Sequence, residues 1–251
     1  MLTPERHQLI LSMLKEKDTV RINELVEVTG ASESTIRRDL SELEEQSFLK
    51  RVHGGASSMQ NKIEEPTMLE KSVKNEREKS AIAKYAASLV NERDSIFIDA
   101  GSTTLRMVPF LPYENIVVVT NSPDIGIQLI KRNIKTFLIG GELKAATWSL
   151  VGRDAIKSIG QYRFDKCFIG TNGIDPTHGL TTPDPDEAYV KQLALQYSDR
   201  RYVLSDSHKF NRVTFAKMGD LSDVTIVTDE GLSEEDQLIY SKLTTIKVVK
   251  S

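Results

Sequence analysis

Five short polar loops carry the side chains best suited to binding a ligand in this chain. Each follows an apolar, strand-like run, and together they hold Asp99, Gly101, Ser102, Thr103, Thr104, Thr120, Asn121, Gly140, Gly141, Thr171, Asn172, Gly173, Asp206 and Lys209. A Gly-Ser-Thr-Thr loop that opens a helix offers N–H groups and hydroxyls to an anion, reinforced by the helix dipole. Asp99 and Asp206 could accept hydrogen bonds from sugar hydroxyls, and Lys209 could supply positive charge to a phosphate.

Glu187 and Lys191 extend this candidate ligand-binding site on a helical stretch further along the chain. Glu187 could accept from sugar hydroxyls and Lys191 could pair with a phosphate. Their i, i+4 spacing also fits a plain surface pair, worth about 0.2–0.5 kcal/mol. Glycines after strands are likewise common turn residues, so the binding interpretation depends on all five loops converging on one sheet edge.

A second group of polar and basic side chains lies near the N-terminus. A short helix over 22–28, a turn at 29–31 and a helix over about 32–45 have the geometry that places one helix in the DNA major groove. If the second helix buries its apolar stripe, its outer face suits phosphates and guanine edges. The expected DNA-binding residues are Ser32, Ser34, Thr35, Arg37, Arg38 and, on a following wing, Lys50, Arg51 and His53. The alternative is a small helical domain with a solvated basic face.

The N-terminal elements follow from apolar spacing. Leu9, Ile10, Met13 and Leu14 predict a helix over about 4–16, with Thr3 as N-cap. Residues 48–52 are typical of a strand, and the paired glycines after His53 suit a tight turn that needs positive φ.

The C-terminal part alternates strands with helices. Apolar runs at 95–98, 116–119, 136–139, 166–169, 202–204 and 225–227 predict strands, and stretches at 82–90, 125–131, 155–159, 188–197 and 234–243 predict helices. Near-continuous apolar strands alternating with helices indicate a parallel sheet covered on both faces. Ligands of such sheets bind beyond the carboxyl ends of the strands, where the polar loops lie.

Composition sets broad limits. The net charge of the 251 residues is −3, and residues 1–60 contain 8 Lys/Arg against 10 Asp/Glu. DNA binding must therefore come from local placement of charge. No apolar run approaches the roughly 20 residues that span a bilayer, and the N-terminus lacks a signal pattern. Cys167 is the single cysteine, so no internal disulfide forms. We expect a cytoplasmic protein that does not associate with membranes.

Two domains are expected. Residues 1–57 form a winged helix-turn-helix, residues 58–74 form a polar linker that contains a proline, and residues 75–251 form an α/β effector-binding domain.

The N-terminal motifs resemble those of DeoR-family transcriptional repressors. Residues 32–40 (SESTIRRDL), 49–56 (LKRVHGGA) and 4–7 (PERH) carry the resemblance. It implies that Ser34, Thr35, Arg37 and Arg38 belong to the recognition helix and Arg51 to the wing.

The C-terminal half also resembles the DeoR-type sensor, which is similar in fold to ribose-5-phosphate isomerase. The matching segments are 99–104, 120–121, 140–141, 170–175, 179–181 and 205–209. The resemblance implies a phosphorylated sugar as effector. Residues 1–6 and 181–184 are most similar to fructose-operon repressors, which makes fructose 1-phosphate the leading candidate inducer.

The competing hypothesis is a sugar-phosphate isomerase with an appended regulatory domain. Isomerases of this fold carry paired aspartates after the fourth strand and a glutamate base, whereas this chain has no carboxylate there before Asp175. Glu187 could lie near the base position, but the glycine-rich run before it is replaced by 181–186 (TTPDPD). We therefore expect binding without turnover, and no catalytic residue or cofactor.

Other chemistry has little support in the sequence. The four histidines lack ligand spacing, so no metal site is expected, and Cys167 within an apolar run fits a small buried hydrophobe. Trp148 fits a core, pocket or interface position equally well. Because one recognition helix reads few base pairs, we expect a homo-oligomer that binds double-stranded operator DNA.

Overall fold

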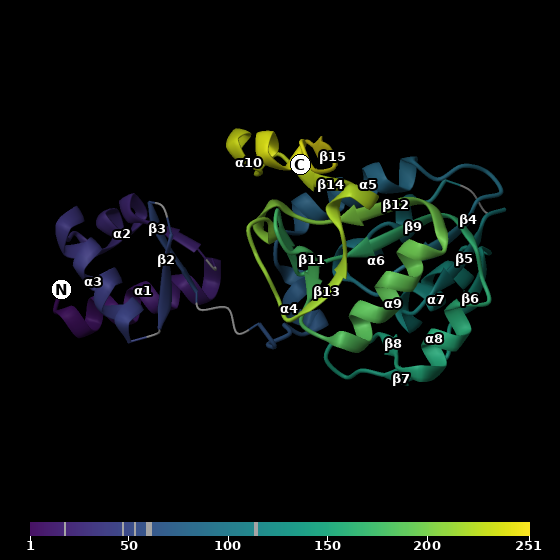
Figure 1. Cartoon of the computed structure of the whole chain (residues 1–251), viewed down its shortest axis with the longest axis horizontal. Helices are drawn as coiled ribbons and strands as arrows, with labels where there is room; N and C mark the ends of the chain where they lie inside the picture. The colour runs from purple at the N-terminus through teal and green to yellow at the C-terminus, as the bar shows by residue number, and fades with distance from the viewer. Residues whose placement is uncertain (18, 47, 53, 59–61, 113–114) are drawn as a thin grey trace. The chain divides into compact units, whose positions relative to one another are not determined.

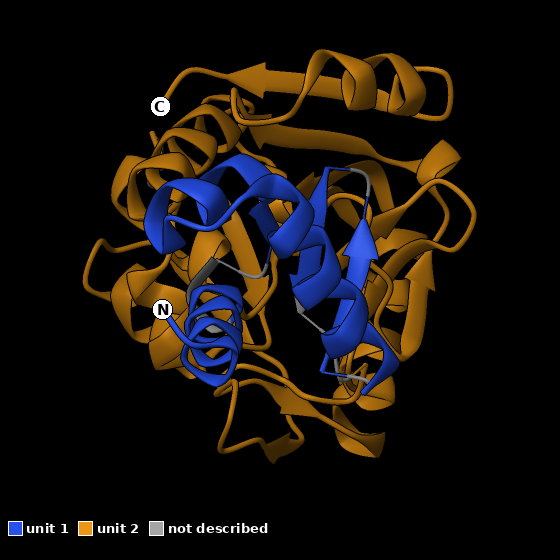
Figure 2. Cartoon of the chain, turned by 90° about the vertical axis from the view of Figure 1, so that its left-hand side faces the viewer, with its two compact units in different colours: residues 1–61 blue, residues 62–251 orange. Residues whose placement is uncertain are grey.

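The computed structural model describes residues 1–17, 19–46, 48–52, 54–58, 62–112 and 115–251. It divides into two compact units, residues 1–61 and 62–251 (Figures 1 and 2). The division lies inside the segment 58–74 that was expected to be a linker. His53 of the expected wing lies outside the described residues.

Unit 1 is a winged helix-turn-helix, as predicted. Its elements are α1 (Thr3–Lys17), β1 (Thr19–Arg21), α2 (Ile22–Thr29), α3 (Glu33–Glu45), β2 (Leu49–Val52) and β3 (Gly55–Ser58). The three strands form an antiparallel sheet in the order β1-β3-β2. The helix α1 begins one residue earlier than predicted, so Thr3 lies within the helix and is not its N-cap. The Thr3 hydroxyl accepts from Arg6 Nη2 at 3.3 Å.

The core of unit 1 is an apolar cluster shared by all three helices and the sheet. Ile10, Leu25, Ile36, Leu40 and Leu49 are fully buried in it. The predicted apolar stripes therefore face one another, and this packing fixes the angle between α2 and α3.

The two wing glycines have different roles. Gly54 has φ +78°, the positive value expected for a tight turn. Gly55 does not, but a Cβ placed on it would lie 2.0 Å from the carbonyl oxygen of Val20. The prediction of positive φ is thus correct for Gly54, while Gly55 is required by the close approach of β1.

Unit 2 is built on a parallel sheet, as predicted. Within its described residues, seven strands pair in the order β15-β14-β12-β9-β4-β5-β6 (Figure 1). Their bounds are β4 (Ser95–Ile98), β5 (Val117–Thr120), β6 (Lys135–Leu138), β9 (Phe164–Gly170), β12 (Ser198–Leu204), β14 (Thr225–Asp229) and β15 (Thr245–Val249). Six of these strands match predicted runs, whereas β15 was missed.

Helices cover both faces of this sheet. They are α4 (Met68–Val73), α5 (Glu76–Ser88), α6 (Ser102–Leu105), η1 (Val108–Phe110), α7 (Pro123–Ile130), α8 (Arg153–Ile159), α9 (Pro185–Gln196), η2 (Ser207–Lys209), η3 (Leu221–Asp223) and α10 (Glu234–Tyr240). Two smaller antiparallel sheets add β7 (Glu142–Leu143), β8 (Leu150–Val151), β10 (Gly173–Asp175), β11 (Gly179–Thr182) and β13 (Ala216–Gly219).

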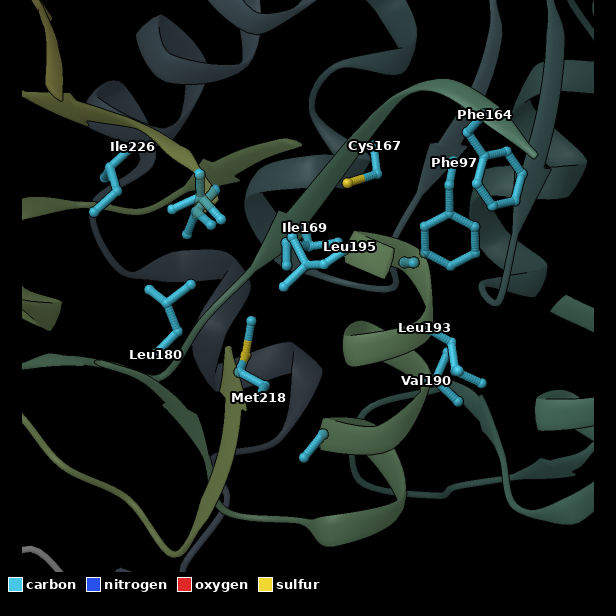
Figure 3. Packing of buried hydrophobic residues seen from close by; sticks show 14 of the residues in the cluster. Phe97, Phe164, Cys167, Ile169, Leu180, Val190, Leu193, Leu195, Met218 and Ile226 are labelled. Carbon is cyan, nitrogen blue, oxygen red and sulfur yellow. The ribbon is translucent and has the colours of Figure 1, made fainter. Parts of the chain in front are cut away.

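Alternate side chains of the strands enter two separate apolar clusters. Phe97, Cys167 and Val203 pack with α8 and α9 on one face, which Figure 3 shows in part. Ile98 and Phe168 pack with α5 and α7 on the other. This alternation is the period-2 pattern of a sheet buried on both sides.

Cys167 lies within the first of these clusters (Figure 3). Burial raises the pKa of its thiol to about 11. The side chain is therefore a buried hydrophobe, as expected, and remains a thiol at neutral pH.

The first residues of unit 2 are ordered against it. Thr67 caps α4 by accepting from the Glu70 N–H, and the Met68 N–H donates to the Ala146 carbonyl at 2.8 Å. The expected linker thus contains a helix packed on unit 2. Among the described residues, no helix combines the length and apolar character that crossing a membrane requires.

Candidate nucleic-acid interface and effector site

The turn between α2 and α3 sets the direction in which α3 leaves the end of α2. Gly30 ends α2 with φ +69°, and its N–H donates to the Val26 carbonyl at 2.9 Å. Ser32 then caps α3 by accepting from the Thr35 N–H at 3.3 Å. A left-handed glycine followed by a serine cap is a compact way to start a new helix at a steep angle.

The polar side of α3 is open to solvent. Ile36, Leu40 and Leu43 are buried. The residues named from sequence face the other way: Ser32, Ser34, Arg37 and Arg38 are exposed, and Thr35 is half-buried. Their contact with DNA remains a prediction, but the geometry leaves them accessible to it.

The wing is tied to this helix by Arg51. Its Nη1 donates to Ser41 Oγ at 2.9 Å, and its backbone N–H donates to Glu44 Oε1 at 2.7 Å. Arg37 is held by Glu33 one turn earlier, at 2.6 Å, in an exposed pair. Lys50 is exposed on the wing. These contacts fix the orientation of Arg37 and Arg51.

Sequence reasoning missed the contact that anchors α3 to α1. Arg6 binds Asp39 through two hydrogen bonds, Nε to Oδ2 at 2.5 Å and Nη2 to Oδ1 at 2.7 Å, and both residues are buried. Burial acts to raise the pKa of Asp39, but the hydrogen bonds and the charge of Arg6 outweigh that effect. The pKa of Asp39 therefore lies below its usual value. The available signal was an aspartate within the apolar stripe of α3.

His7 and Glu42 complete a small group around Asp39. His7 Nε2 lies 3.2 Å from Asp39 Oδ1 and 3.8 Å from Glu42 Oε2, a spacing that metal ligands also show. Arg6 already supplies a full positive charge to both oxygens of Asp39. The ion pair is therefore sufficient to explain the group, and we assign no metal to it.

In unit 2, Asp99 and Lys191 meet beyond the carboxyl end of β4. Both are buried, at 1% and 4% exposed, and form an ion pair. The Gly170 N–H donates to Asp99 Oδ2 at 3.1 Å, and Lys191 Nζ donates to the Gly170 carbonyl at 3.1 Å. Burial raises the pKa of Asp99 against the effect of Lys191. The structure thus brings together the loop after β4, the end of β9 and the helix α9, all of which carry residues named from the sequence.

Asn121 connects the loop after β5 to the loop after β4. Its Oδ1 accepts from the Ala100 N–H at 2.8 Å, and Thr104 Oγ1 donates to the Asp99 carbonyl at 2.6 Å. Thr120 accepts from the Ser122 N–H at 3.1 Å. These side chains hold the Asp99 loop in place. Ser102 and Thr103 lie, largely buried, at the start of α6 after Gly101.

Glu187 is the acceptor in a second buried network. Its Oε1 receives hydrogen bonds from Thr147 at 2.5 Å, Ser149 at 3.0 Å and Lys144 at 3.0 Å. Burial acts to raise the pKa of Glu187, but Lys191, Thr147 and Lys144 lower it to about 2. Glu187 is 5% exposed. The alternative of a plain surface pair with Lys191 is therefore wrong.

Lys144 also binds two further carboxylates. Its Nζ lies 2.9 Å from Asp184 Oδ2 and 2.9 Å from Glu65 Oε2, while Lys71 Nζ lies 3.0 Å from Glu65 Oε1. Glu65 belongs to the first residues of unit 2. A continuous chain of ion pairs therefore runs from that segment to Glu187.

Asp206 lies among several cations beyond the end of β12. Burial acts to raise its pKa, but His208 and the charges of Lys209 and Lys79 lower it to about 2. Lys79 is 5% exposed, and burial lowers its pKa to about 8, with Lys209 and Arg106 adding to that effect. Lys79, Lys209 and His208 thus lie around Asp206, and the carboxylate of Asp229 also acts on His208.

The remaining residues named from sequence have local structural roles, and their contact with an effector stays a prediction. Gly140 is exposed, and a Cβ on Gly141, which has φ +131°, would lie 2.4 Å from the Val151 carbonyl oxygen. Gly141 thus serves a close turn beside α8. Thr171 and Asn172 bond to Thr181 and Thr182, and a Cβ on Gly173 would meet the Arg212 carbonyl at 2.5 Å. These three residues shape the hairpin between β10 and β11.

Trp148 lies in the turn that carries Thr147 and Ser149. It is 38% exposed and has φ +53°, an unusual backbone conformation for a bulky residue. The core alternative for this residue is therefore wrong. Thr147 and Ser149 both reach Glu187, so the strained turn is held by the buried network.

A winged helix-turn-helix followed by a parallel α/β unit with buried charges at its strand ends defines a two-domain transcriptional regulator. The chain belongs to the DeoR family: residues 6–62 match the DeoR-like helix-turn-helix domain, and residues 74–230 match the DeoR C-terminal sensor domain. The resemblance noted in the sequence is confirmed, and the isomerase alternative is set aside.

Relatives extend over nearly the whole chain. The uncharacterized HTH-type transcriptional regulator FruR of Bacillus subtilis (strain 168) is 49% identical, with 100% of both chains covered. The HTH-type transcriptional regulator GlpR of Haloferax volcanii is 34% identical over 94% of this chain and 93% of its own. A lactose phosphotransferase system repressor of Staphylococcus epidermidis is 32% identical over 94% and 96%.

The solved structures to which the chain is similar include two ribose-5-phosphate isomerases. That of Neisseria gonorrhoeae has a TM-score of 0.40 and 16% identity, covering 53% of this chain and 52% of its own. That of Methanocaldococcus jannaschii has a TM-score of 0.41 and 17% identity, covering 54% and 55%.

Proposed function

We propose that this regulator represses a sugar-utilisation operon and leaves its operator when it binds a phosphorylated sugar. The exposed side of α3 and the wing bind the DNA, and the strand ends of unit 2 bind the effector. The effector lowers operator affinity only if it favours the state that binds DNA weakly.

The observation that carries this proposal is the cation cluster around Asp206. Burial lowers the pKa of Lys79 to about 8; Asp206 opposes this shift, and the positive charges of Lys209, Arg106 and Lys71 add to it. A buried ammonium beside other cations is unfavourable unless anions neutralise it, and Asp206 supplies only part of that charge. A phosphate dianion, with three acceptor oxygens, meets that need.

The neighbouring carboxylates suit the hydroxyl groups of a sugar. Asp99 and Glu187 are buried acceptors oriented by Lys191 and Lys144. Ser102 and Thr103 add hydroxyls at the start of α6. A ligand with a phosphate at one end and hydroxyls along its length would satisfy both groups.

Fructose 1-phosphate is the leading candidate for this ligand. The 49% identical relative carries the name FruR, and residues 1–6 and 181–184 are most similar to fructose-operon repressors. A more distant relative is named as a lactose phosphotransferase system repressor, which supports the broader class of sugar-responsive repression.

We further propose that the Glu65 segment transmits the signal. Glu65 lies between the unit boundary and α4, and it shares Lys144 with Glu187. A ligand hydroxyl that binds Glu187 competes with Lys144 for the carboxylate oxygens of Glu187. This competition changes the ion pair between Lys144 and Glu65. The connection to unit 1 would thereby respond to the effector.

The effector can be identified by calorimetric titration of the full chain with fructose 1-phosphate, fructose 6-phosphate, fructose and inorganic phosphate. We expect fructose 1-phosphate to bind most tightly and fructose least. The variant Lys209→Ala should lose the preference for phosphorylated ligands while still binding DNA. Equal binding of fructose and fructose 1-phosphate would contradict the assignment of the cation cluster.

A further inference from the structure

One edge of the parallel sheet carries an apolar surface formed by α7 and β6. Ile127 is 55% exposed, Ile130 65% and Leu138 49%. A Cβ placed on Gly126 would lie 3.9 Å from Leu138 Cδ1, so the helix and the strand are in contact below these side chains. Ile127, Ile130 and Leu138 are called the α7 face below.

The strand beneath the α7 face ends the sheet. Among the described residues, β6 pairs with β5 on one side and with no strand on the other. The opposite edge strand, β15, exposes Thr245 and Lys247, whereas β6 exposes Phe137 and Leu138 beside a single lysine, Lys135. Polar side chains of that kind protect an edge, whereas an apolar edge is typical of an interface.

We propose that a second copy of this chain packs on the α7 face, with its own α7 antiparallel to the first about a two-fold axis. Such an interface is isologous, so each residue must be complementary to the residue related by the axis. This gives a surface to the oligomer that the proposed function requires, and it stands on observations separate from the effector site.

The charges of α7 fit that arrangement. Asp124, Ile127 and Lys131 are spaced i, i+3 and i+7, which places them on one side of the helix. Asp124 and Lys131 stand about 10 Å apart along the axis, with Ile127 between them. Neither has an ion-pair partner in the part of the chain that the structure describes.

An antiparallel pair of α7 helices centred near Ile127 brings each Asp124 opposite the Lys131 of the other copy. Two ion pairs then flank an apolar centre made by the isoleucines. Apolar centres with charged rims are the usual anatomy of protein interfaces.

A second helix with exposed apolar residues, α10, is less suited to this role. α10 exposes Leu238 at 63% and Ile239 at 41%, but its first turn carries Glu234, Glu235 and Asp236. Three carboxylates of one helix would face at most one lysine of its copy, Lys242. Self-association through α10 would therefore concentrate negative charge, so it provides a matched control.

Sedimentation velocity of the full chain, without DNA or effector, tests the proposal. The wild-type protein should self-associate at micromolar concentration. Ile127→Glu should weaken association at least about tenfold, as expected for an apolar residue at an interface centre, whereas Leu238→Glu should not. Effector binding should be unchanged in both variants, which shows that unit 2 remains folded.

Charge reversal gives an independent test that does not alter the apolar centre. Asp124→Lys and Lys131→Asp should each weaken association because like charges then face each other, and the double variant should recover most of it. A monomeric wild type would overturn the proposal, as would association that survives Ile127→Glu or is lost in Leu238→Glu. A wild-type protein that self-associates but binds no effector would count against the proposed function and leave this proposal standing.

Discussion

Glu65 and Glu187 bind the same ammonium group, that of Lys144, at 2.9 and 3.0 Å. Glu187 lies on α9 at the candidate effector site, and Glu65 lies just beyond the boundary between the two units. A change in the hydrogen bonds of Glu187 therefore alters the ammonium group that also binds Glu65, in the segment that leads to the DNA-binding unit.

Replacing Glu65 should separate effector binding from release of DNA. In Glu65→Gln, Lys144 and Lys71 lose a shared carboxylate, while Asp99, Glu187 and Lys191 keep their contacts. We expect nearly normal effector affinity by calorimetry. The change in operator affinity on adding effector, typically about 5- to 150-fold in such systems, should shrink toward unity. Glu64→Gln, at the exposed neighbouring position, is the control, and equal loss of coupling there would contradict the role of Glu65.

Effector binding should depend on pH through Lys79. Burial lowers the pKa of this amine to about 8, and a bound anion raises it again because it stabilises the ammonium form. Binding therefore takes up a proton near and above pH 8, and affinity should fall as the pH rises through that value. Calorimetry between pH 7 and 9.5 should show this in the wild type.

The variant Lys79→Met should bind the effector weakly and lose this pH dependence. Lys157→Met, on the exposed side of α8, should behave as the wild type. A wild-type affinity that stays level across the range would show that Lys79 does not meet the phosphate.

The ion pair between Arg6 and Asp39 should be essential for unit 1. Removing one partner of a buried pair leaves the other charge uncompensated, at a cost of about 3–5 kcal/mol. We expect Arg6→Ala to unfold unit 1 at markedly lower temperature and to abolish operator binding, while unit 2 still binds effector. Glu33→Gln, which breaks the exposed pair with Arg37, should cost less than about 1 kcal/mol. Similar unfolding temperatures for the two variants would contradict this account.

The exposed arginines of α3 should contribute differently from distant surface charges. If Arg38 contacts a phosphate, Arg38→Ala should weaken operator binding and reduce the salt slope by about one. Arg37→Ala should have a similar effect, because the wild-type Arg37 exchanges Glu33 for a phosphate when it binds DNA. Lys84→Ala, exposed on α5, should leave the isotherm unchanged. Binding curves of the arginine variants that coincide with the wild type would remove those residues from the interface.

Much of the fold was predictable because the apolar spacing is locally consistent. The stripes of α1 to α3 and six strands of the main sheet follow from periodicity alone. β15 was missed although Ile246 and Val248 alternate with polar residues, because Thr245 and Lys247 interrupt its apolar run. α4 was missed because its polar surroundings and Pro66 are typical of a linker, whereas the capping box of Thr67 and Glu70 starts a helix there.

The effector site was predictable only where its residues follow strands. Asp99, Asn121 and Asp206 stand at strand ends, so topology alone predicts that they share one edge. Lys79 and Lys144 look like ordinary surface lysines in the sequence, and their burial arises from the packing of α5 and of the turn beside Trp148. Asp39 was a missed local signal, since a carboxylate within a buried stripe requires a partner.

The most direct test of the central claim is fluorescence anisotropy of the DNA upstream of this protein's own operon, titrated with the full chain at physiological salt with and without fructose 1-phosphate. The account predicts tight, specific binding that weakens when the sugar phosphate is added. Operator binding that stays the same or tightens at saturating fructose 1-phosphate would contradict it.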